Sequence, residues 1–148
     1  MNEKLIVALD YAYENEAREL VSQLDDAVSY YKVGLELFLN TRGSIIDYLK
    51  HCGKKVFLDL KFHDIPNTVA QAAAWAASFG VDMFTLHASG GAEMMRTSVD
   101  TVNDICDKLN VKMPQMVGVT ILTSFDEEGI ARVGYKDNIA NTVLNLAK

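Results

Sequence analysis

The chain has 148 residues, a net charge of −6, 49% hydrophobic residues and 23% charged residues. This composition is typical of a globular protein, and we expect one domain over residues 1–148. The acidic excess argues against general binding to nucleic acid or to anionic membranes, because both select basic surfaces. It does not exclude a phosphorylated small molecule, which a single local site can bind.

No apolar run approaches the ~20 residues that a membrane-spanning helix requires. The N-terminus shows neither the basic region nor the cleavage site of a signal peptide. Cys52 and Cys106 are too few for a disulfide framework. Each falls on the apolar stripe of a predicted helix, so we expect both to be reduced core residues. The sequence therefore predicts a cytoplasmic protein.

Short apolar runs alternate with amphipathic stretches along the chain. The runs predict five strands, at residues 5–10, 29–35, 55–61, 83–88 and 116–122. Apolar stripes at helical spacing follow them over residues 17–24, 45–52, 69–77 and 95–109, and a fifth helix is expected after Asp137 as N-cap. Strands that are apolar on both faces and alternate with helices form parallel sheets. We therefore predict an α/β fold of five βα units.

An open doubly wound sheet and a (βα)8 barrel both fit this order of elements. Polar residues favour the barrel because they lie in or just after all five strands. These residues are Asp10, Lys32, Asp59 with Lys61, His87, and Thr120 to Thr123. In a barrel the carboxyl ends of all strands meet at one active-site mouth, whereas an open sheet concentrates function at one switch point. A complete barrel takes about 250 residues, so this chain supplies roughly the first five of eight βα units.

The segment VFLDLKFHDIPNT, residues 56–68, places three charges and a histidine at the end of a predicted strand. Strand alternation puts Asp59 and Lys61 on the same face, with their Cα atoms ~6.5–7 Å apart. Burying a charge is costly unless it is paired, so a neighbouring carboxylate favours the protonated lysine. Asp64 follows the strand, where the loop can aim it at the same lysine or across an interface. A lone Asp-x-Lys pair would be read as a structural ion pair.

Two further residues change that interpretation. Lys32 and Asp10 occupy matching places on neighbouring predicted strands. Two lysines and three aspartates at one mouth are more charge than a stable core requires. We therefore interpret Asp10, Lys32, Asp59, Lys61 and Asp64 as a catalytic array.

The stretch FLDLKFHDIPNTV, residues 57–69, resembles the signature of the orotidine 5′-phosphate decarboxylase family, Asp-x-Lys-x-x-Asp followed by Ile-Pro-x-Thr. The resemblance continues, in the same order, through VALD at 7–10, KVGLELF at 32–38, LHASGGAEMM at 86–95 and VTILTS at 119–124. Sister sugar-phosphate decarboxylases share Asp-x-Lys-x-x-Asp. The Ile-Pro-Asn-Thr continuation fits the orotidine branch better.

The resemblance implies a (βα)8 barrel, and a homodimer with its active sites at the subunit interface, without metal or organic cofactor. It implies conversion of orotidine 5′-monophosphate to UMP and CO2, the last step of de novo UMP synthesis. Lys61 would protonate C6 of the pyrimidine, Asp59 would lie beside the departing carboxylate, and Lys32 would hold the array. The substrate-binding residues that it implies are Asp10, Lys32, Asp59, Leu60, Lys61, Phe62, His63, Asp64, Ile65, Pro66, Asn67, Thr68 and Thr123. Of these, Asp64 and Thr68 would come from the partner subunit.

The same resemblance places the phosphate-binding residues of the family beyond the five units present here. We therefore expect the 148 residues alone to have little or no activity. Two alternatives stay open. One is a keto-sugar phosphate decarboxylase that recruits a divalent metal, and the other is an inactive half-barrel module whose charges specify a dimer interface.

Overall fold

The computed structural model describes residues 5–148 of the chain. Its single sheet has five parallel strands in the order β1-β2-β3-β4-β5. The strands are β1 (Val7–Leu9), β2 (Tyr30–Gly34), β3 (Lys55–Phe62), β4 (Met83–His87) and β5 (Gln115–Val119). Each strand pairs with the next one along the chain, without the reversal of order that an open doubly wound sheet shows. The predicted α/β fold, with the first five units of a barrel, is confirmed.

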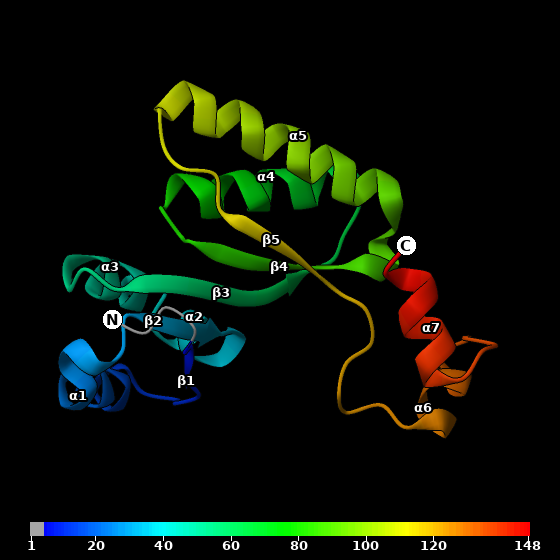
Figure 1. Cartoon of the computed structure of the whole chain (residues 1–148), viewed down its shortest axis with the longest axis horizontal. Helices are drawn as coiled ribbons and strands as arrows, with labels where there is room; N and C mark the ends of the chain where they lie inside the picture. Colours follow the sequence, from blue (N-terminus) through cyan, green and yellow to red (C-terminus); the bar gives the residue numbers. More distant parts are fainter. Residues whose placement is uncertain (1–4) are drawn as a thin grey trace.

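Helices connect the strands and continue after β5. They are α1 (Glu14–Leu24) with the short η1 (Asp25–Ala27), α2 (Leu35–Asn40), α3 (Ser44–His51), α4 (Pro66–Ser78), η2 (Ala88–Gly90), α5 (Gly91–Leu109), α6 (Glu127–Arg132) and α7 (Ile139–Leu146). Figure 1 shows α4 and α5 side by side along one side of β3 and β4. In the same view, α6 and α7 lie at the end toward which β3, β4 and β5 point.

The outer face of the sheet, which the connecting helices cover, carries the core. Its side chains include Val33, Val56, Leu58, Phe84 and Leu86, none more than 3% exposed. The alanines of α4 share this core because small side chains allow a helix to approach the sheet closely. Pro66 opens α4 at a position where its missing N–H costs nothing, and Gly80 follows the end of α4 with φ +74°.

The opposite, inner face carries the residues that alternate with these core residues. Lys32, Phe57, Asp59 and Val117 lie on it, and all four are partly or largely exposed. Thr85, in the centre of β4, is an exception because it is only 3% exposed. The inner face is thus the more open and more polar side of the sheet.

Some helix details differ from the sequence-based expectation. Cys52 is exposed rather than in the core, because α3 ends at His51 and Cys52 begins the turn into β3; Cys106 is buried as expected. The buried stripe of α5 runs through Met94, Ser98, Val102 and Cys106, and the Ser98 hydroxyl is satisfied by donating to the Met94 carbonyl.

The last two helices add further differences. The side chain of Asn138, not that of Asp137, caps α7 by accepting from the Asn141 N–H. Thr142 is the buried residue that α7 contributes, and Ile139, Val143 and Leu146 of the same helix are half-buried. The acidic run at 126–128 begins α6, which Asp126 caps by accepting from the Gly129 N–H. Among residues 5–148, no helix combines the length and apolar character needed to span a bilayer.

Candidate active site

The candidate site starts from an irregular stretch of β3. This strand pairs with β4 at Leu58–Phe84 and next at Phe62–Leu86, so Asp59, Leu60 and Lys61 stand opposite Thr85 alone. Lys61 has φ +51°, the left-handed region that is unfavourable by about 1–2 kcal/mol for a residue other than glycine. Such bulges re-aim side chains and are frequent beside active sites. Strand alternation predicted that Asp59 and Lys61 meet, but it did not predict this backbone.

Four charged side chains form one connected array on the inner face. The Lys61 Nζ donates to Asp59 Oδ1 at 2.9 Å, and Lys32 Nζ lies 3.9 Å from Asp59 Oδ2. Lys32 also donates to Asp10 Oδ1 at 3.0 Å. The Asp59 side chain is 16% exposed, whereas that of Asp10 is 73% exposed. Asp59 therefore joins both lysines, and the array opens toward solvent at Asp10.

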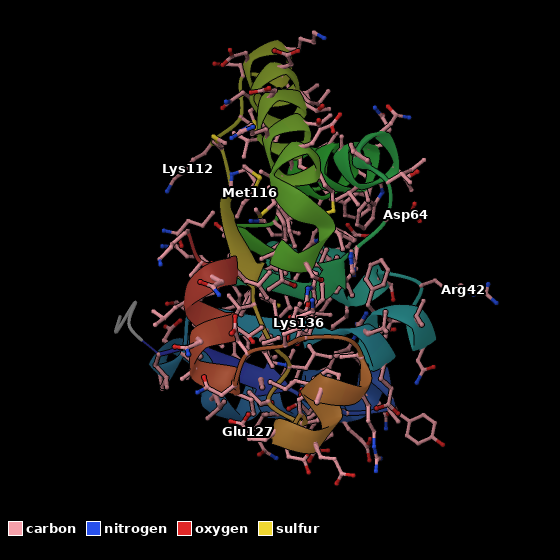
Figure 2. All side chains as sticks on the ribbon, turned by 90° about the vertical axis from the view of Figure 1, so that its right-hand side faces the viewer. Arg42, Asp64, Lys112, Met116, Glu127 and Lys136 are labelled. Carbon is pink, nitrogen blue, oxygen red and sulfur yellow. The ribbon has the colours of Figure 1, made fainter. Side chains whose placement is uncertain are left out.

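Asp64 does not join this array within the chain. Its carboxylate accepts from the Ile65 N–H at 2.6 Å, in the loop between β3 and α4. Figure 2 shows the Asp64 side chain at the margin of the molecule, pointing away from it. Ile65 is 67% exposed and Thr68 is exposed in the first turn of α4. Of the two positions that the sequence left open for Asp64, contact with Lys61 is therefore not made in this chain.

The other implied substrate-binding residues belong to β3, to α4 and to the segment after β5. Leu60 and Phe62 pack partly against the core, and Phe62 contacts Phe84 with ring centroids 5.9 Å apart. Pro66 and Asn67 belong to the first turn of α4. Thr123 is exposed in the segment that leads from β5 to α6.

Two histidines stack at the carboxyl ends of β3 and β4. The rings of His63 and His87 have centroids 5.1 Å apart and an interplanar angle of 16°. Burial, with smaller contributions from His63 and then Lys61, lowers the pKa of His87 below its usual 6.5. The Nδ1 atom of His87 also lies 2.6 Å from the Ser89 hydroxyl oxygen. The lowered pKa favours the neutral form of His87, which lies close enough to Lys61 for the lysine charge to contribute to the shift.

A pocket of about 250 Å³ lies beside this histidine pair. Its lining includes His63, His87, Ile121, Phe125 and Tyr135, so the segment after β5 forms its far wall. In Figure 2, which looks along the strands from this end, α6 and α7 lie in front of the sheet; Glu127 begins α6, and Lys136 lies in the segment between the two helices. The array and the pocket thus share the end of the sheet where barrel active sites are built.

A larger cavity, of about 480 Å³, lies at the opposite end of the strands. Tyr30, Lys55, Asp82 and Gln115 line it at the amino ends of β2 to β5. Burial and then the charge of Asp82 raise the pKa of Tyr30 to about 12, so this phenol stays protonated near neutral pH. Residues at this end of a barrel serve stability rather than chemistry. Cavity size is therefore a poorer guide to the site here than the connected charges.

Thr85 is a site residue that the sequence analysis missed. Its hydroxyl donates to Asp59 Oδ1 at 3.0 Å and accepts from the Lys61 backbone N–H at 2.8 Å. Alternation along β4 places Thr85 on the same face as His87, and that signal was available. The signal is weak because a threonine carries no charge and strands commonly contain one.

Fold and site together define the class of protein, a (βα) barrel with a lysine–carboxylate array at the carboxyl ends of its strands. Comparison with known proteins identifies the family. Residues 3–148 match the model of the orotidine 5′-phosphate decarboxylase / HUMPS family. The chain therefore belongs to this family, and the resemblance that the sequence suggested is confirmed.

Named relatives agree with this assignment. The orotidine 5′-phosphate decarboxylase of Carboxydothermus hydrogenoformans is 47% identical over 148 residues, which cover 100% of this chain and 61% of the relative. That of Neisseria gonorrhoeae is 44% identical and matches 97% of this chain and 56% of its own length. The crystal structure of the Lactobacillus acidophilus enzyme of the same name superposes with a TM-score of 0.87 at 36% identity, covering 97% of this chain and 65% of that one. The chain thus spans about 60% of the length of the curated relatives it matches.

Proposed function

We propose that this chain forms part of an enzyme that decarboxylates orotidine 5′-monophosphate to UMP and CO2 in pyrimidine biosynthesis. The observation that carries the proposal is the array in which Asp59 holds Lys61 at 2.9 Å and faces Lys32 at 3.9 Å. Relatives with 42–47% identity carry the corresponding name.

In the proposed reaction, the bond between C6 of the pyrimidine and its carboxylate carbon breaks. The electron pair stays on C6, in the ring plane, where the ring π system stabilises it poorly. A fixed ammonium at Lys61 stabilises this developing charge and then transfers a proton to C6, after which water restores the proton on Lys61. No step requires a cofactor.

The other members of the array take supporting roles in this proposal. Asp59 lies beside the departing carboxylate and holds Lys61, while Lys32 fixes Asp59 and contacts the ribose. Asp10, whose carboxylate is largely exposed, accepts from a ribose hydroxyl. Thr123 lies beside the pyrimidine. Leu60, Phe62, His63, Pro66 and Asn67 complete the surroundings of the substrate, as the family signature implies.

We further propose that the enzyme is a homodimer with shared sites. Asp64, Ile65 and Thr68 are exposed, and the Asp64 carboxylate accepts a hydrogen bond from the adjacent Ile65 N–H. These residues are therefore free to reach a neighbouring subunit, with Asp64 directed at the array and Ile65 at the pocket wall. A single domain over residues 1–148 and a cytoplasmic location also stay predictions.

The test compares two samples. One is the 148-residue chain, and the other is the completed protein, defined as this chain joined to the part of the C. hydrogenoformans relative that it does not cover. The completed protein is expected to release CO2 from orotidine 5′-monophosphate, and the chain alone is expected to release little or none. Full activity of the chain alone would contradict the expectation that phosphate binding needs the missing part. A completed protein that folds but has no activity would contradict the proposed function.

A keto-sugar phosphate decarboxylase stays a second candidate, because the sister sugar-phosphate decarboxylases share the Asp-x-Lys-x-x-Asp motif of residues 59–64. Because that candidate recruits a divalent metal, EDTA should abolish its activity. We expect the activity of the completed protein on orotidine 5′-monophosphate to survive EDTA.

Mixing variants tests the shared site. Completed proteins that carry Lys61→Ala or Asp64→Ala should each be inactive. A 1:1 mixture that exchanges subunits should recover about a quarter of wild-type activity, because half of the dimers are hybrid and each hybrid has one intact site. A mixture that stays inactive despite subunit exchange would place both residues in the same subunit's site.

A further inference from the structure

The hydroxyl of Thr85 lies beneath the charged array and is almost completely shielded from solvent. Thr85 is 3% exposed, and its Oγ1 atom lies 3.0 Å from Asp59 Oδ1 and 2.8 Å from the Lys61 backbone nitrogen. The amide N–H can only donate, so the hydroxyl accepts from Lys61 and directs its own proton to Asp59. One hydroxyl therefore connects the carboxylate of one array residue with the backbone of the other.

The same hydroxyl accepts a backbone hydrogen bond at a point where the regular pairing of β3 with β4 is interrupted. Regular pairing of β3 with β4 stops after Leu58 and resumes at Phe62, and the Lys61 N–H in between bonds to the Thr85 side chain. Left-handed backbone at a lysine persists only where its surroundings fix it. Within residues 5–148, the recorded hydrogen bond of this amide is the one to Thr85.

We propose that Thr85 is a positioning residue that sets the direction of the Lys61 ammonium. The Thr85 hydroxyl contacts both ends of the Lys61 residue's anchoring. It accepts from the left-handed Lys61 backbone, and it donates to the Asp59 carboxylate that binds the Lys61 ammonium. Without the hydroxyl, Asp59 Oδ1 loses one of the two donors that it has among residues 5–148. The flexible Lys61 side chain is then the contact that resists rotation of the carboxylate toward Lys32. The inference rests on the proposed function, because it concerns the group that delivers the proton.

A change of about 1 Å in the placement of a reacting group can lower a rate about 100-fold. Thr85→Val keeps the shape of the side chain and removes the oxygen. In the completed protein, we expect this variant to lower kcat by about 10- to 100-fold with KM changed less than about threefold. Thr85→Ser keeps the oxygen, and it should restore kcat to within about threefold of wild type.

Two outcomes would overturn the proposal: a Thr85→Val variant within about twofold of wild-type kcat, or a Thr85→Ser variant as impaired as Thr85→Val. If Thr85→Val does not fold, the comparison moves to Thr85→Ser and Thr85→Ala, which differ by one oxygen atom. Equal kcat values for those two variants would also overturn it.

A structural readout separates this inference from the proposed function. If the wild-type completed protein does not act on orotidine 5′-monophosphate, the proposed function fails, and crystal structures of wild type and Thr85→Ala still decide the positioning role. The variant should show a rotated Asp59 carboxylate or a Lys61 residue that has left the left-handed region. An unchanged Asp59–Lys61 arrangement would refute the role of Thr85.

Discussion

A lysine–aspartate pair lies near each end of β3, and the pairs look alike in isolation. Lys61 and Asp59 belong to β3 itself, whereas Lys50 belongs to α3 and Asp82 directly precedes β4. Lys61 meets Asp59 at 2.9 Å at the carboxyl end, and Lys50 meets Asp82 at 3.2 Å at the amino end. Both lysine side chains are 38% exposed. An exposed ion pair of this kind contributes only ~0–1 kcal/mol to stability, so a gain in stability does not account for either pair.

The two aspartates differ in their other contacts. Asp59 also faces Lys32 and accepts from the Thr85 hydroxyl, next to left-handed backbone at Lys61. Asp82 accepts from the backbone N–H of Val56 and so ties β4 to regular β3. A pair that sits on regular backbone and bonds to the main chain is a structural pair. A pair that gathers further charge on strained backbone indicates chemistry.

The largest expected effect separates the two lysines. In the completed protein, Lys61→Ala should lower kcat by more than about a thousandfold, because it removes both the stabilising charge and the proton donor. Lys50→Ala, the matched control, should stay within about twofold of wild type. The decarboxylation of orotidine 5′-monophosphate measures activity, and size-exclusion chromatography measures the oligomeric state. A Lys61→Ala variant that loses its oligomeric state along with activity would favour the interface-module alternative.

Substitution of Asp59 should mainly lower activity, whereas substitution of Asp82 should mainly lower stability. Asp59→Asn should lower kcat by at least about 100-fold, since the array loses its central negative charge. Asp82→Asn should leave kcat nearly unchanged and cost about 1 kcal/mol of unfolding free energy, because it weakens a charge-assisted hydrogen bond. Steady-state kinetics and urea denaturation check the pattern, and equal losses of kcat in both variants would erase the distinction.

The two faces of the sheet offer a comparison within one residue type. Val56 lies on the outer face and is fully buried, whereas Val117 lies on the inner face and is 38% exposed. Val56→Ala should cost about 2–3 kcal/mol of unfolding free energy, from lost burial and the cavity left behind. Val117→Ala should cost less than about 1 kcal/mol. This test uses the chain without its completion, because the comparison presumes the open inner face. Similar costs would show that the inner face is already packed in the isolated chain.

The smallest effect concerns the histidine pair. The pKa of His87 is lower in the folded chain than its usual 6.5, so near and below that pH the unfolded chain binds more protons. Stability is therefore expected to be complete above about pH 6.5 and to fall as the pH drops through the folded pKa. Thermal unfolding of wild type and His87→Gln between pH 7.5 and 5.5 should show a shallower decline for the variant. Parallel curves would contradict this role of His87.

The sequence predicted the sheet and the proximity of four charged residues because both depend on local patterns. Apolar runs located all five strands, and the polar residues in or just after three of them, Asp10, Lys32, Asp59 and Lys61, form one connected array. The bulge at Lys61 was out of reach, since it depends on a hydroxyl from β4, 24 residues further along the chain. The exposure of Cys52 was mispredicted for a related reason. An apolar stripe does not mark the residue at which the helix ends.

The central claim is that the Lys61 amine, anchored by Asp59, stands beside the carbon that loses CO2. A crystal structure of the completed protein with bound UMP tests it most directly. We expect the Lys61 Nζ within about 3.5 Å of C6 of the pyrimidine, with its contact to Asp59 retained. A pyrimidine bound elsewhere, or an Nζ atom turned away from C6 toward solvent, would refute the proposed role of Lys61.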